Sequence, residues 1–266
     1  MQFLADFTTD ETGSIPASGV VAPTAPSVER FVTESAYTID MNEAVRELFA
    51  GNDRHVEAVS ETLKELQASQ HPEIVTVCCG DSRVLQDDMW DNHQPGRVFT
   101  HSNIGNRVVQ ETTEGRVIAG DVLYPLVHTE THTAIVVGHT GCGAVTAAYH
   151  DLTDGIDEPA GIDYCVNLLE WDLGQGVEAL PRGLDDAAAV NHLVEYNVDR
   201  QVDHLVESHD VPESVTVLGA VYDFHDAYSQ SRGAVHVINV DGTRETEAIR
   251  ERHPELGEYV HRLWEY

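Results

Sequence analysis

The sequence predicts an α/β fold with a mostly parallel central sheet flanked by helices. Short apolar runs with the length of buried strands alternate along the chain with longer segments whose apolar residues recur at helical spacing. Strands that alternate with helices usually form a parallel sheet that is covered on its faces. The chain has 266 residues, 41% of them hydrophobic, which is enough to bury a sizeable core.

The N-terminal residues, 1–36, are expected to form an irregular arm. They mix Thr, Ser, Pro, Ala and Gly and show little periodicity. Residues 37–266 are predicted to form one α/β domain. Asp40, followed three residues later by Glu43, is a plausible capping pair for the first helix of this domain.

The predicted elements of this domain follow in chain order. Helices are expected over residues 40–51, 53–68, 114–128, 142–150, 163–171 and 186–208, with a further helical segment at the C-terminus. Strands are expected over residues 74–78, 98–100, 134–137, 215–222 and 234–240. Two of these strands, 74–78 and 134–137, run directly into segments with metal-binding side chains. Open α/β sheets carry their binding sites at the carboxyl ends of the strands, so we expect the two segments to meet.

These two segments supply the residue types that bind zinc. The first is Cys79-Gly80-Asp81-Ser82-Arg83, and the second is His139-Thr140-Gly141-Cys142. Thiolates and imidazoles are the ligands that zinc prefers, and three strong protein ligands are typical of a catalytic site, which keeps one position for water or substrate. We therefore predict that the domain is catalytic and binds Zn²⁺ through Cys79, His139 and Cys142.

Cysteine also has roles other than binding a catalytic zinc ion. A free cysteine often behaves as a small buried apolar residue, and this interpretation suits Cys78 and Cys165. A structural zinc site would need a fourth strong ligand. Side chains alternate along extended backbone, so Cys78 should point away from Cys79, whereas Asp81 should lie on the same side. Asp81 is therefore the local candidate for a fourth ligand.

Asp81 and Arg83 form a second predicted unit beside the metal. Arg83 can hold the Asp81 carboxylate ionised through paired hydrogen bonds. Asp81 then either accepts a hydrogen bond from water on the zinc or binds the zinc itself. The alternative is a solvated surface ion pair of little energetic value.

The charge of the chain is extreme. It contains 46 acidic and 15 basic residues, for a net charge of −31, and Lys64 is its only lysine. Acidic residues run through every segment, which indicates an acidic surface that repels itself at low salt and is screened within about 3 Å at 1 M salt. This composition resembles that of proteins from salt-accumulating halophiles, whereas an ordinary acidic protein would carry more lysine. Nucleic acid and anionic membranes are not expected as partners.

Several features favour a cytoplasmic location. The four cysteines show no framework of paired spacings, which indicates a reducing compartment. The first ten residues carry no basic side chain, so they predict neither a signal peptide nor a transit peptide. No apolar run approaches the roughly 20 residues that span a bilayer.

The motifs C-x-D-x-R (Cys79–Arg83) and H-x-x-C-G (His139–Gly143) resemble those of the β-class carbonic anhydrases. The resemblance covers about residues 40–245, in the order of the family. Its supporting segments are Leu48–Asn52, Gln94–Gly96, Asn103–Asn106, Val221–Asp223 and Val237–Asn239. Together with the two motifs, these segments make the resemblance specific.

The resemblance implies zinc-dependent reversible hydration of carbon dioxide to bicarbonate by a zinc-bound hydroxide. Zinc lowers the pKa of its water from 15.7 to near 7, so hydroxide is present at neutral pH. In the family pattern, Asp81 accepts the proton of this hydroxide and orients it, and Arg83 keeps Asp81 anionic. Gln94 matches a position that binds substrate or bicarbonate. A closed, inactive state, in which Asp81 replaces the water as fourth ligand, is also implied.

The family builds its active-site cleft at a subunit interface, so the resemblance implies a homodimer or a higher even homo-oligomer. Ser102 stands where members often carry an arginine of a regulatory bicarbonate site, so such regulation is not expected here. Pro125 is expected to disturb its helix locally. Two other functions stay open: the same scaffold hydrolysing carbonyl sulfide or carbon disulfide, and a non-catalytic oligomer that zinc stabilises.

Overall fold

The computed structural model describes residues 41–266 of the chain. The chain falls into two units, one that reaches Asn52 and a second, larger one that runs from Asp53 to Tyr266. The predicted arm, residues 1–36, and the domain boundary that follows it lie outside the described residues. Both stay predictions. No helix within residues 41–266 is long and apolar enough to cross a bilayer.

The first helix, α1 (Met41–Glu65), is continuous over 25 residues. The expectation of two helices, one ending near Gly51 and the next starting at 53, is therefore wrong. A glycine inside a helix costs about 1 kcal/mol relative to alanine, but it does not stop a helix that has good helix formers on both sides. Gly51 therefore does not end the helix, because its cost is small compared with the helical preference of the residues around it.

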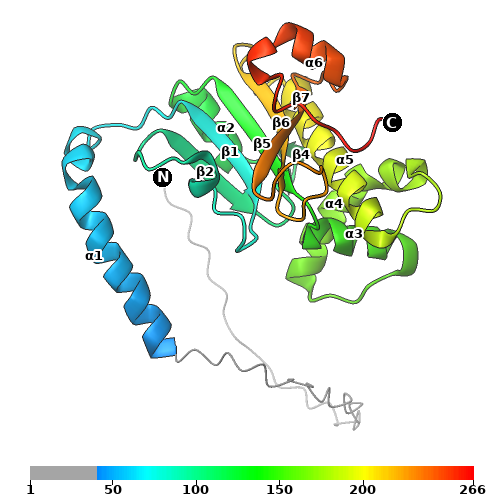
Figure 1. Ribbon diagram of the computed structural model, residues 1–266, viewed down its shortest axis with the longest axis horizontal. Coiled ribbons are helices and arrows are strands. Elements are labelled where there is room, and N and C mark those ends of the chain that lie inside the picture. The colour runs from blue at the N-terminus through cyan, green and yellow to red at the C-terminus, as the bar shows by residue number, and fades with distance from the viewer. Residues whose placement is uncertain (1–40) are drawn as a thin grey trace, which may run out of the picture. The chain divides into compact units, whose positions relative to one another are not determined.

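Five strands form the central sheet, which confirms the predicted fold class (Figure 1). They are β1 (Ile74–Cys79), β2 (Val98–Asn103), β5 (Thr133–His139), β6 (Thr216–Asp223) and β7 (Ala234–Val240). The order is β2-β1-β5-β6-β7, in which only β7 pairs antiparallel with its neighbour. Since β1 and β5 are parallel neighbours, their carboxyl ends lie at the same edge of the sheet.

The other helices are α2 (Gly120–His128), α3 (Gly143–Asp154), α4 (Ala160–Ala179), α5 (Asp186–Glu207) and α6 (Thr246–Arg252), with 3-10 turns at Asp88–Trp90 and Pro254–Leu256. Pro125 lies inside α2, where it has no N–H to donate, and the helix is only nine residues long. The chain after α6 and its 3-10 turn is irregular, so the C-terminus is helical only in part.

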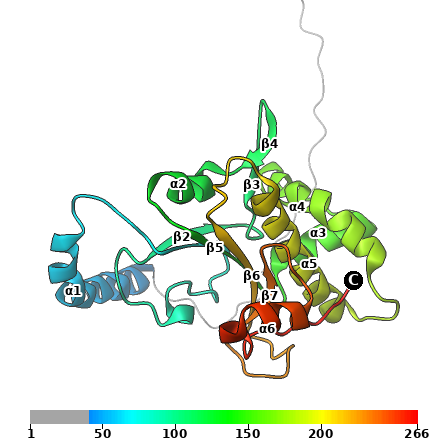
Figure 2. The same ribbon diagram turned by 90° about the horizontal axis from the view of Figure 1, so that it is seen from above.

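The predicted helix over residues 114–128 is wrong at its beginning. β3 (Val109–Thr112) and β4 (Gly115–Ile118) form an antiparallel hairpin that stands apart from the central sheet (Figure 2). Gly115 has a φ of 99°, a left-handed conformation that favours glycine. The chain therefore reverses its direction at a glycine, a residue to which the helical pattern gave no structural role.

The main core lies between the sheet and helices α2 to α5. Val75, Val77 and Cys79 of β1 belong to this apolar cluster. Cys78 belongs instead to a separate cluster that includes Val137. The prediction that Cys78 and Cys79 point to opposite faces of their strand is thus confirmed.

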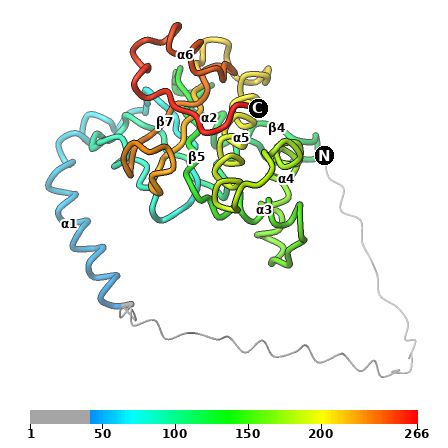
Figure 3. The backbone as a smooth tube through the Cα atoms, turned by 45° about the vertical axis from the view of Figure 1, so that its right-hand side comes forward, coloured from blue at the N-terminus to red at the C-terminus, as the bar shows by residue number. Residues whose placement is uncertain are grey.

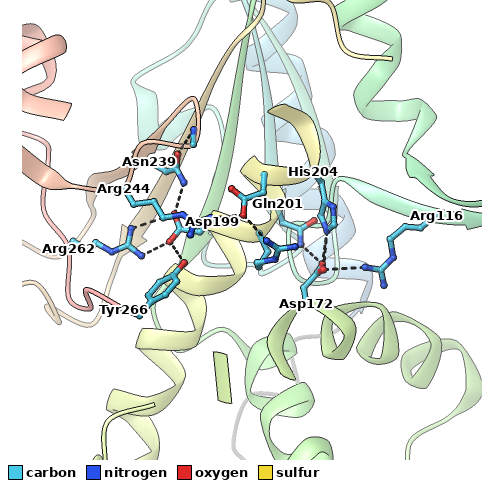
Figure 4. Close-up of polar contacts among 12 residues, drawn as sticks. Arg116, Asp172, Asp199, Gln201, His204, Asn239, Arg244, Arg262 and Tyr266 are labelled. Carbon is cyan, nitrogen blue, oxygen red and sulfur yellow. Dashed lines mark hydrogen bonds and ion pairs between the residues drawn. The ribbon is translucent and has the colours of Figure 1, made fainter. Parts of the chain in front are cut away.

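The C-terminal segment runs beside α5 (Figure 3). Helix α5 carries two buried carboxylates, Glu195 and Asp199. Asp199 receives an ion pair from Arg262 and hydrogen bonds from the Tyr266 hydroxyl (2.7 Å) and the Asn239 amide (2.7 Å), as Figure 4 shows. Arg262 is itself almost fully buried. The irregular end of the chain is therefore held to α5 by charge pairing in addition to apolar contact.

Glu195, one turn before Asp199 on α5, is the second buried carboxylate. It accepts hydrogen bonds from the backbone N–H groups of Leu263 (2.8 Å) and Trp264 (2.9 Å) and from the hydroxyl of Tyr228 (2.6 Å). Tyr228 belongs to the loop between β6 and β7. One carboxylate therefore joins the C-terminal segment to that loop.

Candidate active site

The three predicted zinc ligands converge at the carboxyl edge of the sheet. Cys79 is the last residue of β1, His139 is the last residue of β5, and Cys142 directly precedes α3. Their ligand atoms all lie within 4.8 Å of one another. In the turn between the last two ligands, Gly141 has a φ of 61°, and a Cβ there would come within 2.6 Å of the His225 ring. Glycine is therefore required for the turn that delivers Cys142.

The geometry of these residues fits a zinc ion. The sulfur atoms of Cys79 and Cys142 lie 3.7 Å apart. Two sulfurs at 2.3 Å from a tetrahedral zinc would be about 3.8 Å apart. His139 places Nδ1 3.0 Å from the carbonyl oxygen of Thr140, so Nδ1 donates its proton there and Nε2 keeps its lone pair. Nε2 is buried and has no hydrogen-bond partner, as expected of an atom aimed at a metal.

The thiols of Cys79 and Cys142 differ in the direction of their pKa shifts. The Cys142 thiol donates a hydrogen bond to Cys79, which holds the pKa of Cys79 well below its ordinary value. The same bond, together with burial, raises the pKa of Cys142. Burial likewise raises the pKa of Cys78 to about 12, so this neighbour remains a neutral thiol. The hydrogen bond between the two residues therefore favours ionisation of Cys79 over ionisation of Cys142.

Asp81 and Arg83 form a two-point ion pair beside the ligands. Arg83 donates from Nε to Oδ1 (2.9 Å) and from Nη2 to Oδ2 (2.6 Å), and its backbone N–H also donates to Oδ1 (2.9 Å). These bonds hold the pKa of Asp81 far below its usual range. Asp81 Oδ2 lies 3.7 Å from Nε2 of His139. Within residues 41–266, the cluster of metal-binding atoms contains the three ligands and not this carboxylate.

The remaining residues named from the sequence lie elsewhere. Gln94 lines a groove together with His55 and Val59 of α1, and none of the three zinc ligands lines this groove. Ser102 belongs to β2. Cys165, on α4, accepts a hydrogen bond of 3.5 Å from the guanidinium of Arg107. It therefore contributes to packing and does not belong to the cluster of Cys79, His139 and Cys142.

The sequence interpretation named Val221–Asp223 only as a supporting segment and gave no role in the site to Asp223, the last residue of β6, or to Phe224, which follows it. Asp223 is fully buried and accepts a hydrogen bond from the hydroxyl of Thr140, in the turn between two zinc ligands. Phe224 stacks on the His139 ring, with centroids 5.3 Å apart. His139 pairs in register with Tyr222 of β6, so the loop after β6 starts at the same edge as the ligands. The strand-end argument, applied to β6, would have identified it.

Comparison with known proteins identifies the family to which the chain belongs. The sequence model of the carbonic anhydrase family matches residues 74–229, more than half of the chain. A carbonic anhydrase of Emericella nidulans is 28% identical over 183 residues, which are 68% of this chain and 75% of that protein. A carbonic anhydrase of Helicobacter pylori is 28% identical over 123 residues, 45% of this chain and 53% of that one.

Solved structures share the fold. A tetrameric β-carbonic anhydrase of Sordaria macrospora has a TM-score of 0.60 at 22% identity, covering 74% of this chain and 96% of that one. A Coccomyxa β-carbonic anhydrase, determined with acetazolamide, has a TM-score of 0.60 at 22% identity, covering 84% and 100%. The sequence match, the fold and the cluster of possible metal ligands agree: the chain belongs to the carbonic anhydrase family, as an enzyme with the β-class fold.

Proposed function

We propose that this chain catalyses the zinc-dependent, reversible hydration of carbon dioxide to bicarbonate. The observation that carries the proposal is the cluster of Cys79, His139 and Cys142, in which His139 Nε2 is buried without a hydrogen-bond partner. When bound there, zinc would supply the lowering of the pKa of water that makes hydroxide available near neutral pH. The overall reaction adds this oxygen to the carbon of carbon dioxide and releases one proton to solvent.

Asp81 is proposed to orient the nucleophile. Its carboxylate is ionised, so it can only accept hydrogen bonds, and a nucleophile that donates its proton to Asp81 is left with its lone pairs free to attack. Arg83 engages both oxygens of this carboxylate and fixes the plane in which it accepts.

The same contacts favour the orienting role of Asp81 over its role as fourth ligand. A closed site would require Asp81 to turn toward the metal, and both guanidinium bonds from Arg83 would then break or lengthen. A steep loss of activity below neutral pH would support the closed state. Gln94 is proposed, from the family pattern, to bind substrate or bicarbonate, and Gln94→Ala should then raise KM more than it lowers kcat.

The test combines stopped-flow hydration of carbon dioxide in molar salt with metal analysis. Asp81→Ala should stay folded, keep its zinc and lose about 10- to 100-fold in activity, the range found when a partner of a metal ligand is removed. The matched control is Asp157→Ala, which removes an exposed carboxylate from the loop between α3 and α4 and should change nothing. Turnover of carbon disulfide without hydration of carbon dioxide would overturn the proposal, as would an Asp81→Ala variant of full activity.

We also propose that the chain assembles into a homodimer or a higher even oligomer. The helix α1 supports this, because its apolar side chains Leu48 (74%), Phe49 (68%), Val56 (51%) and Leu63 (44%) are exposed. Exposed apolar stripes of this kind mark protein–protein contacts. Phe49→Glu should reduce the mass measured by sedimentation, whereas Ala50→Glu, which places the same charge on another side of α1, should not.

A high-salt, reducing cytoplasm is the proposed location. The charge of −31 and the single lysine support the high salt, and the four cysteines, all free, support the reducing compartment. Fractionation of cells in molar salt, followed by detection of the chain in the soluble cytoplasmic fraction, tests this location. Recovery from an oxidising compartment with cysteines paired would contradict it.

A further inference from the structure

Phe224, in the loop after β6, contacts two groups of the site at once. Its ring stacks on the imidazole of His139, with centroids 5.3 Å apart and planes inclined by 25°. The guanidinium carbon of Arg83 lies 4.4 Å from the centroid of the same ring. We infer that Phe224 is a positioning residue that holds Arg83, and through it Asp81, beside the metal ligands. The inference rests on the proposed function, since it concerns the ion pair that this function uses.

Arg83 needs such a support because its ion pair is exposed. The side chain of Arg83 is 55% exposed, and at such a position even a two-point ion pair contributes much only while its geometry is held. Molar salt weakens them further by screening. A cation held against an aromatic ring is favoured by about two- to fivefold at an exposed site. The ring also excludes water from one side of the guanidinium, so this contact is less sensitive to salt than the ion pair alone.

The loop that carries Phe224 is held at both of its flanks. Asp223 accepts hydrogen bonds from the Thr140 hydroxyl (3.2 Å) and from the backbone N–H of Tyr228 (3.0 Å). Tyr228 in turn donates its hydroxyl to the buried carboxylate of Glu195 (2.6 Å). Hydrogen bonds therefore hold the backbone on both sides of the Phe224 ring. On one side they reach the turn between His139 and Cys142, and on the other they reach α5.

An apolar filling role is the competing explanation. Phe224 packs against a small cluster that includes Cys78, Val84 and Val137. A residue that only fills space is replaced by leucine with little effect on Arg83, because leucine offers similar apolar bulk. A residue that positions Arg83 must offer a ring face, so tyrosine should replace it and leucine should not.

The experiment therefore compares aromatic and aliphatic replacements in the full chain. Phe224→Leu and Phe224→Met remove the ring, and Phe224→Tyr keeps it. Tyr149→Leu is the matched control, because it removes a partly buried aromatic ring that packs on the main core from α3. The first readout is the rate at which the Arg83 Nε–H exchanges with water, followed by nuclear magnetic resonance in metal-free and zinc-loaded protein. The signal is assigned by its loss in Arg83→Lys. The second readout is kcat and KM, with zinc content measured alongside.

We expect Phe224→Leu and Phe224→Met to keep zinc, to speed exchange at Arg83 by about two- to fivefold or more, and to lower kcat by a similar factor. Phe224→Tyr should stay close to the wild type. The Cδ protons of wild-type Arg83 should also resonate upfield of their ordinary position because of the ring current. A normal position of these signals overturns the inference even if the aliphatic variants fail to fold.

Two further results would overturn it: unchanged exchange at Arg83 in Phe224→Leu, or an equal acceleration in Tyr149→Leu. The exchange measurement needs no turnover. A wild type that fails to hydrate carbon dioxide therefore refutes the proposed function alone, whereas an active wild type with unaltered exchange in the leucine variant refutes the positioning role alone.

Discussion

The sulfur atoms of Cys79 and Cys142 lie 3.7 Å apart, although 63 positions separate them in the chain. The distance results from the parallel pairing of β1 with β5, which ends both strands at one edge, and from the short turn that leads from β5 into α3. The proposed metal site is thus formed by the fold and not by a local sequence motif. Each half of the motif, taken alone, offers an incomplete set of ligands.

The first prediction concerns these ligands. Cys142→Ala should reduce zinc content from about one ion per chain to a small fraction, because a catalytic zinc site has no protein ligand to spare. Cys78→Ala is the matched control, since this cysteine faces the opposite side of β1 and should keep the metal. Inductively coupled plasma mass spectrometry after dialysis measures the content. Full zinc in Cys142→Ala would refute the ligand assignment.

The second prediction concerns pH and the stability of the fold. Burial raises the pKa of Glu195 in the folded chain to about 7, against 4.5 for an unperturbed glutamate. Between these values the folded state binds more protons at Glu195 than the unfolded state, so the contribution of Glu195 to stability is fully present below about pH 4.5 and is lost as pH rises through about 7. The shift corresponds to about 3 kcal/mol in the free energy of unfolding.

Glu195→Gln removes this titration, so its unfolding free energy should fall less than that of the wild type between pH 4.5 and 8. Denaturant titrations in molar salt measure the difference. Glu255→Gln, an exposed position near the C-terminus, is the control and should follow the wild type. A Glu195→Gln slope identical to the wild type would show that the carboxyl titrates at its ordinary pKa.

The third prediction concerns the C-terminal segment. Arg262→Leu should destabilise the fold by about 3–5 kcal/mol, because it leaves the fully buried carboxylate of Asp199 without its principal counter-charge. Arg97→Leu breaks an exposed pair with Glu73 and should cost less than about 1 kcal/mol. Chemical denaturation compares the two. Equal losses would mean that the Arg262 pair is no more important than a surface contact.

The fourth prediction concerns salt. With a net charge of −31, the chain should gain stability and activity as potassium chloride rises from 0.1 M to 1 M, since the screening length falls from about 10 Å to about 3 Å over this range. Thermal melting and hydration rates at each concentration check this. An uncharged osmolyte at equal osmolality serves as the control. Full stability at low ionic strength would contradict the interpretation of a salt-adapted surface.

The fold and the ligands could be predicted because each depends on a short-range signal. The strands that end at Cys79 and His139 are apolar runs, and their ends show which residues reach the edge of a sheet. The hairpin of β3 and β4 was missed because its short strands carry mixed residues and because a single glycine, Gly115, marks its turn in the sequence.

Other features depend on contacts between distant segments. From the sequence alone, Glu195 and Asp199 would be expected on the exposed face of α5. Both are fully buried, because the C-terminal segment supplies their hydrogen-bond and ion-pair partners. Phe224 carries no spacing signal, since its significance comes from the His139 ring at the end of β5 and from the Arg83 charge in the turn after β1. No periodicity in one segment predicts which other segment will cover it.

Because Glu195 accepts hydrogen bonds from both Tyr228 and the backbone at Leu263 and Trp264, the end of the chain and the loop beside the metal site share one anchor. Proteolytic trimming that removes Leu263 and Trp264 would take away two of these three hydrogen bonds while leaving every predicted metal ligand in place. Such a clipped enzyme would keep a normal metal content and still turn over slowly. Intact mass is therefore the measurement to make on any preparation whose activity falls short of its zinc content.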